Sequence, residues 1–368
     1  MSNTEKFIRV ENTREIDRSD EKWLHPLLRN QAVISSSDQT IKDWFDPKKP
    51  VEERREAVKA GVEPYIEFYK AQVDTDEVKA QGDWLEYTID ERCPEETDAP
   101  KMRAVVRMPK GTEGKKLPAV MHIGGGALAY SMPECWLTMI YQCSSICNAV
   151  VVSPRYRPAL EAPYPCAIND LHAAYAWMVN NADKLNIDPD KIAIIGNSSG
   201  GHLATALSFR LKRYGYQPRG CVVTMPITDD RMDKDSSRYY ITDGEWDGPA
   251  VHLSAAQWLG TENLASPLIG PEAFANHASV EDCKGLCPML ITTAEMDPDS
   301  DYTLEFVQKL KKAGVFVDYH LWGGNTHSKG AGINEDTLKF AAKMDHVFYQ
   351  GVKDCLENDL RRPWTLDE

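Results

Sequence analysis

The spacing of hydrophobic positions changes near residue 80. Before it, charged stretches with helical periodicity predominate, as in Val51-Glu-Glu-Arg-Arg-Glu-Ala-Val. After it, segments at Trp84–Ile89 and Met102–Met108 alternate apolar and polar residues, which predicts strands with one solvated face. The continuous apolar runs Leu117–Ile123 and Ala149–Ser153 are typical of buried parallel strands.

Apolar runs and helical patterns then alternate along the chain. Further strands are predicted at Ile192–Gly196, Cys221–Met225, Met289–Thr293 and Val315–Trp322, and helices at about 167–181, 302–313 and 335–356. Strands that alternate with helices need crossover connections, which make the sheet parallel and cover both of its faces. The alternation stops between about residues 229 and 284, which predicts an insertion over one edge of the sheet.

A serine between glycines stands where one buried strand gives way to a helix. Gly196-Asn-Ser198-Ser-Gly200 follows the strand that begins at Ile192. Such a corner needs small residues beside the serine and pushes the hydroxyl of Ser198 above the edge of the sheet. The helix beyond directs free amides and its positive end to the same place. The segment therefore predicts a serine nucleophile next to an oxyanion site.

Two later strands end close to residues that suit a catalytic triad. Asp297 follows the run 289–293, and His327 follows a glycine pair after the run 315–322. Chemistry gathers at the carboxyl ends of parallel strands, and the order serine, acid, histidine is that of α/β-hydrolases. We expect His327 to take the proton of Ser198 and Asp297 to orient the imidazole.

Other residues compete for the roles of acid and base. Asp299 and Asp301 lie close to Asp297, which also suits the capping of a helix. The alternative bases are His202, four residues beyond the serine, and His122, in the strand before a run of glycines.

That run, Gly124-Gly125-Gly126, predicts the second half of the oxyanion site. Bare glycines let backbone amides approach a substrate closely. We therefore expect the amides of Gly125, Gly126 and Ser199 to point at one oxygen.

The same run matches a dinucleotide-binding pattern, Gly124-x-Gly126-x-x-Ala129. That pattern belongs after the first strand of a domain and needs an acid about 20 residues later. Here at least two strands come first, and the next strand ends in Ser153-Pro-Arg155. We expect no cofactor.

Charge and cysteine content narrow the classes of function. The 368 residues carry a formal net charge of −14, which disfavours binding to nucleic acid or to an anionic membrane. Nine cysteines are scattered without the spacing of a disulfide framework or a metal site. The start of the chain lacks an apolar leader segment. These features predict a cytoplasmic protein with free thiols, no metal and no stable membrane association; a homo-oligomer stays open.

Together these blocks resemble the hormone-sensitive-lipase-like carboxylesterases, from about Leu117 to His327. Gly196-Asn-Ser-Ser-Gly-Gly is similar to the family's Gly-Asp-Ser-Ala-Gly-Gly, and Arg155-Tyr-Arg-Pro-Ala-Leu-Glu-Ala-Pro-Tyr-Pro to its Tyr-Arg-Leu-Ala-Pro-Glu-x-Pro-x-Pro. Asp297-Pro matches the motif of the family's acid. The resemblance implies an α/β-hydrolase fold and a serine carboxylesterase that cleaves small to medium esters with Ser198, His327 and Asp297.

The resemblance also implies a division of the chain. Residues 1–80 and the insertion 229–284 would form a two-part helical cap on a catalytic domain of residues 81–228 and 285–368. The aromatic residues of the insertion would line the substrate pocket or form the cap's own small core: Tyr239, Tyr240, Trp246 and Trp258.

Three departures from the family pattern concern the oxyanion loop. His122 is displaced by one position, which turns it to the other face of its strand. Ala127 replaces an aromatic residue and is expected to widen the pocket, and Asn197 replaces an acid. The alternatives to an esterase are a lactone or amide hydrolase, an eliminase, and a non-catalytic small-molecule receptor.

Overall fold

The computed structural model describes Leu24, His25, Leu28 and residues 43–112, 114–239, 246–328 and 335–361. An eight-stranded sheet, in the order β1-β2-β4-β3-β5-β6-β7-β8, forms the centre of the molecule. Strands β3 to β8 run parallel to one another, whereas β2 is antiparallel to both of its neighbours, β1 and β4. The strands are β1 Gly82–Ile89, β2 Met102–Pro109, β3 Leu117–Ile123, β4 Val150–Pro154, β5 Ile187–Asn197, β6 Cys221–Thr224, β7 Met289–Ala294 and β8 Val317–Trp322.

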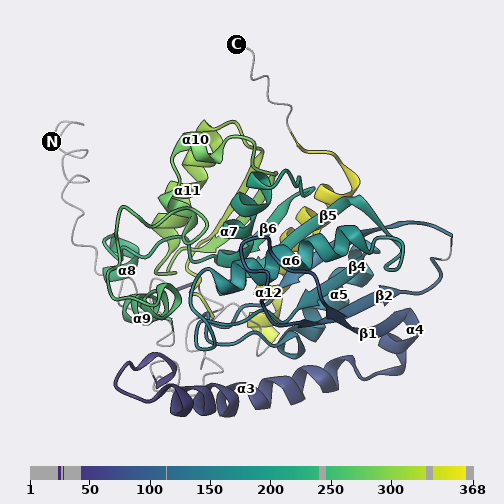
Figure 1. Ribbon diagram of the computed structural model, residues 1–368, viewed down its shortest axis with the longest axis horizontal. Helices are drawn as coiled ribbons and strands as arrows, with labels where there is room; N and C mark the ends of the chain where they lie inside the picture. Colours follow the sequence, from purple (N-terminus) through teal and green to yellow (C-terminus); the bar gives the residue numbers. More distant parts are fainter. Residues whose placement is uncertain are drawn as a thin grey trace.

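Helices cover both faces of this sheet, which confirms the predicted fold class (Figure 1). Helices α6 (Cys166–Asn180), α7 (Ser199–Arg213) and α11 (Ser300–Lys312) pack on one face. Helices α5 (Leu137–Cys147) and α12 (Glu335–Glu357) pack on the other.

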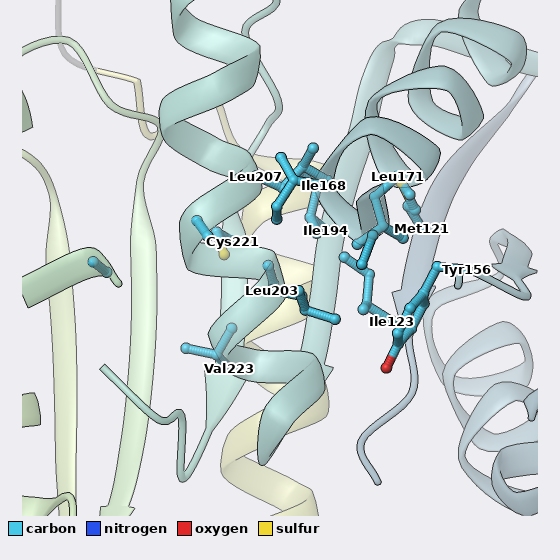
Figure 2. Packing of buried hydrophobic residues seen from close by; sticks show 14 of the residues in the cluster. Met121, Ile123, Tyr156, Ile168, Leu171, Ile194, Leu203, Leu207, Cys221 and Val223 are labelled. Atoms are coloured by element: carbon cyan, nitrogen blue, oxygen red, sulfur yellow. The ribbon is translucent and has the colours of Figure 1, made fainter. Parts of the chain in front are cut away.

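Alternation of side chains along the strands divides the core into two layers. On β3, Met121 and Ile123 pack with α6 and α7, as Figure 2 shows, whereas Val120 belongs to the layer under α5 and α12. On β5, Ile194 likewise packs in the layer under α6 and α7, and Ile195 packs in the layer under α5 and α12. These side chains are fully buried, and each such burial stabilises the fold by about 1.5–3 kcal/mol.

Helix α3 (Val51–Val73) lies along one side of the molecule, and α4 (Asp76–Gln81) leads from it into β1 (Figure 1). Arg54 on α3 donates a 2.6 Å hydrogen bond from Nη1 to Oε1 of Gln257 on α9 (Gly248–Leu259). Helix α3 also packs on η4 (Pro133–Trp136) and α5. The remaining short elements are α8 Asp235–Tyr239, η5 Ala275–His277 and α10 Val280–Cys283.

The helix predicted at residue 51 is therefore confirmed, whereas most of residues 1–42 lies outside the described part of the chain. None of the helices in the described ranges combines the length and apolarity needed to cross a membrane. All nine cysteines are unpaired thiols, as their spacing predicted.

Candidate active site

Ser198 occupies a strained corner between β5 and α7. Its backbone has φ 54° and ψ −128°, a conformation that residues with side chains rarely adopt. The glycines on either side allow the corner to close. A Cβ atom on Gly196 would lie 2.3 Å from the carbonyl oxygen of Gly200, and one on Gly200 would lie 2.1 Å from that of Ile123. Both positions therefore accept only glycine.

His327 lies between Ser198 and Asp297. Its Nε2 is 2.8 Å from Oγ of Ser198, and its Nδ1 is 2.5 Å from Oδ2 of Asp297. A carboxylate can only accept, so the proton of a neutral ring resides on Nδ1 and Nε2 accepts the serine hydrogen. The side chain of Asp297 is fully buried and that of His327 is 10% exposed. The three residues chosen from the sequence thus form one hydrogen-bonded chain.

The two competing acids lie elsewhere. The amide of Asp299 donates a 2.9 Å hydrogen bond to Oδ1 of Asp297, so Asp299 supports the carboxylate through its backbone. Burial and the carboxylates of Asp297 and Asp229 raise the pKa of the Asp299 carboxyl well above its ordinary value. Asp301 accepts a 3.0 Å hydrogen bond from the amide of Ser236.

One interpretation from the sequence is wrong: Asp297 does not cap the helix that follows. Asp299 occupies the residue before α11. Oδ2 of Asp297 faces His327, and Oδ1 accepts the amide of Asp299 in the turn before that helix.

The two competing bases are bonded to other groups. Nδ1 of His202 is 2.8 Å from the carbonyl oxygen of Ile227, and its ring packs against Trp258 and Phe274. Nδ1 of His122 is 2.9 Å from Oγ of Ser153. Burial lowers the pKa of His202 to about 4 and that of His122 to about 3, so both rings stay neutral.

The three amides expected at the oxyanion site lie beside the serine. A Cβ atom on Gly125 would come within 3.2 Å of Cβ of Ser198, so the glycine loop packs directly against the nucleophile corner. Within the described residues, the amides of Gly125, Gly126 and Ser199 donate no hydrogen bond to the protein. Unpaired amides next to a serine hydroxyl suit an incoming oxyanion.

Side chains that the sequence did not single out hold this loop. The hydroxyl of Tyr156 donates a 2.8 Å hydrogen bond to the carbonyl of Gly124. The indole of Trp136 donates to the carbonyl of Gly125 at 3.3 Å. Tyr156 lies inside the Arg155-Tyr-Arg block, which is the signal that would have revealed it. Tyr156 and Trp136 thus brace the glycine loop from outside the sequence segment that contains it.

A cavity of about 390 Å³ opens onto Ser198 and His327. Trp246 lines it and packs against the imidazole of His327, with ring centroids 5.4 Å apart and an angle of 33°. Trp258 is fully buried in the core instead, whereas Tyr240 and the side chain of Tyr239 lie outside the described residues. The other aromatic residues on the cavity wall are Trp44, Tyr65, Tyr69, Tyr130 and Trp136.

Asp229, Asp230 and His277 bring their ligand atoms within 4.8 Å of one another, a spacing that suits a metal ion. Their acceptor atoms are nevertheless engaged. Arg231 and Asn276 donate to Asp229, and Nε2 of His277 is 2.6 Å from Asp230. These contacts join both ends of the insertion, so the cluster has a structural role.

Comparison with known proteins agrees with this architecture. A family model described as the alpha/beta hydrolase fold matches residues 120–329, more than half of the chain. The ethyl acetate hydrolase of Pseudomonas putida is 28% identical over 213 residues, which cover 57% of this chain and 65% of the relative. The gibberellin receptor GID1A of Arabidopsis thaliana is 27% identical over 236 residues, which cover 61% of this chain and 66% of the relative.

The matched segment thus spans just under two thirds of the length of these curated relatives. The solved structure of a bacterial heroin esterase shares the fold, with a TM-score of 0.74 and 23% identity over 92% of this chain and 99% of that chain. From the family match and the sheet together, the chain belongs to the hormone-sensitive-lipase-like family of α/β-hydrolases, which includes carboxylesterases.

Proposed function

We propose that the protein hydrolyses small to medium carboxylic esters through a covalent acyl-enzyme. Ser198 would be the nucleophile, His327 the general base and Asp297 the group that orients the imidazole. The observation that carries this proposal is the hydrogen-bonded chain from Oγ of Ser198 through His327 to Asp297, at the wall of a cavity.

The chemistry follows from the acidity of these groups. A serine hydroxyl is a weak nucleophile at neutral pH, so Nε2 of His327 takes its proton as Oγ attacks the ester carbonyl. Asp297 stabilises the imidazolium that forms. The amides of Gly125, Gly126 and Ser199 bind the oxyanion, each donor contributing roughly 10²–10³ in turnover.

Collapse of this intermediate releases the alcohol. The imidazolium of His327 gives its proton to the leaving oxygen, and the acyl group stays on Ser198. Water then attacks the acyl-enzyme with His327 again as base, and the acid departs as the serine is restored.

We also propose that residues 1–80 and 229–284 act as a two-part cap over the catalytic domain. Tyr65 and Tyr69 of α3 and Trp246 of the insertion all line the cavity, which supports this division. The hydrogen bond from Arg54 to Gln257 links the two parts.

Labelling with a serine-reactive fluorophosphonate, combined with turnover of p-nitrophenyl acetate, tests the proposal. We expect one adduct on Ser198, and we expect Ser198→Ala to lose both labelling and turnover. Ser145→Ala, which alters an exposed serine of α5, is the matched control and should behave as the parent. A parent protein that neither labels nor turns over esters would favour a non-catalytic receptor.

Substrate panels separate the proposal from other hydrolytic activities. Esters, lactones and amides of matched size would be compared by kcat/KM. A clear preference for lactones or amides over the esters would replace the assignment while keeping the same nucleophile.

A further inference from the structure

One acidic side chain, Asp345 of α12, lines the cavity that holds Ser198 and His327. Among the described residues, its carboxylate has neither a hydrogen-bond nor an ion-pair partner. The described wall of the cavity contains no lysine or arginine. Within the part of the chain that the structure describes, the cavity wall thus carries a negative charge without a counter-charge.

The sequence of α12 places no cation where it could pair with Asp345 along the helix. Side chains three and four positions away are the ones that meet on a helix surface. For Asp345 these positions hold Ala341, Ala342, Phe348 and Tyr349, none of which is a cation. A helix that simply needed a surface ion pair would place a lysine or arginine at one of them.

The side chain of Asp345 is exposed to solvent as well as lining the cavity. The protein around it is dense enough, however, that burial raises the pKa of its carboxyl above the ordinary value. A cation that enters the cavity would be attracted to this unpaired carboxylate and would stabilise its charged form.

The rest of the wall suits a cation as well. It includes the aromatic side chains of Trp44, Tyr65, Tyr69 and Trp136, and ring faces attract ammonium groups. Burial raises the pKa of the Tyr69 hydroxyl, so this ring stays neutral. On the described wall, Asp345 is therefore the side chain that can pair with a charged group of a substrate.

We propose that the preferred substrates are esters that carry a cationic ammonium group, held by Asp345 and the aromatic wall while Ser198 attacks the carbonyl. This inference rests on the proposed ester hydrolysis and adds its substrate class.

Acetylcholine and 3,3-dimethylbutyl acetate test it directly. The two esters have the same shape, and only the first carries a positive charge. Acid release at constant pH gives kcat/KM for each. We expect the parent protein to favour the cationic ester, and Asp345→Asn to lower this preference by on the order of tenfold. The kcat/KM for the neutral ester should stay within about twofold, because Asn keeps the shape of Asp.

Glu357→Gln is the matched control, because it removes one negative charge from the exposed end of the same helix. It should leave the preference unchanged, which separates recognition in the cavity from general attraction by an acidic protein. The inference is overturned if the parent hydrolyses the neutral ester equally well, or if Asp345→Asn and Glu357→Gln have equal effects.

A binding measurement separates this inference from the proposed reaction. Calorimetric titration with choline and with 3,3-dimethyl-1-butanol requires no turnover. Tighter binding of choline that is lost in Asp345→Asn supports the cation site even if neither acetate is hydrolysed. Equal binding of the two alcohols contradicts the cation site even if both acetates are hydrolysed.

Discussion

Tyr156 fixes the glycine loop through a single contact: its hydroxyl donates to the carbonyl of Gly124, 2.8 Å away. The next two residues are the proposed oxyanion donors Gly125 and Gly126. Arg157, beside Tyr156, is itself held by Glu96 and Asp170, each at 2.7 Å. A ring fixed in this way positions the loop without touching the substrate.

Removal of this hydroxyl should therefore slow turnover. A neutral hydrogen bond contributes about 1 kcal/mol, so we expect Tyr156→Phe to lower kcat about fivefold with a smaller change in KM. Steady-state kinetics with p-nitrophenyl acetate would measure both. Tyr141→Phe, on the surface of α5, is the control. An unchanged kcat in Tyr156→Phe would show that the loop holds its position without this contact.

Gly125→Ala should disrupt the oxyanion site more severely. The added Cβ would lie 2.6 Å from the carbonyl oxygen of Asn197, which is backbone and cannot turn aside. The loop must move, and loss of a donor costs about 10²–10³ in kcat. Gly270→Ala is a suitable comparison, since nothing lies within 4 Å of the atom that it adds. Equal activity of the two variants would argue against Gly125 as a donor.

Asp297→Asn tests the choice of acid. The side-chain amide of Asn can donate to Nδ1 of His327, which places the ring proton on Nε2 and removes the base. We expect kcat to fall by roughly 10³–10⁴, and the rate of phosphonate labelling to fall with it. Asp301→Asn should stay near the parent. The reverse pattern would move the acid from Asp297 to Asp301.

Buried histidines should make the fold sensitive to acid. Burial lowers the pKa of His202 to about 4, below its unfolded value of 6.5. Between these values the unfolded chain binds a proton that the folded chain does not, so stability falls as the pH drops from about 6.5 towards 4. Such a group lowers the free energy of unfolding by up to about 1.4 kcal/mol per pH unit.

Urea denaturation of the parent and of His202→Gln at pH 7 and pH 5 would measure this effect. We expect the free energy of unfolding to drop less between the two pH values in the variant. His122 and His172 remain in both proteins, with their pKa values lowered to about 3 and about 4, so part of the acid sensitivity should persist. An identical drop in both proteins would exclude His202 as a contributor.

The parallel strands and the serine corner were predictable because their signals are local. Val120 and Ile195 stand in apolar runs, and the glycines around Ser198 are required by contacts within a few residues. Asp297 and His327 were found from their places after strand ends, because a parallel sheet brings those ends together.

The wall of the cavity was not predictable in this way. Tyr65 and Asp345 are 280 positions apart in the chain, and neither belongs to a motif. They line the same cavity only because the fold brings α3 and α12 to it. The role of Tyr156 depends on a contact across 32 positions, so the Arg155-Tyr-Arg block marked its segment without showing which group the hydroxyl holds.

The cavity wall and the catalytic residues stand on different elements of the fold, and this has a practical consequence. The side chains that would choose a substrate stand largely on α3, η4 and α12, whereas Ser198, Asp297 and His327 stand on loops at strand ends. A laboratory effort to redirect selectivity can therefore randomise the inward positions of those helices and leave the reacting groups in place, with Asp345 as the first position to vary.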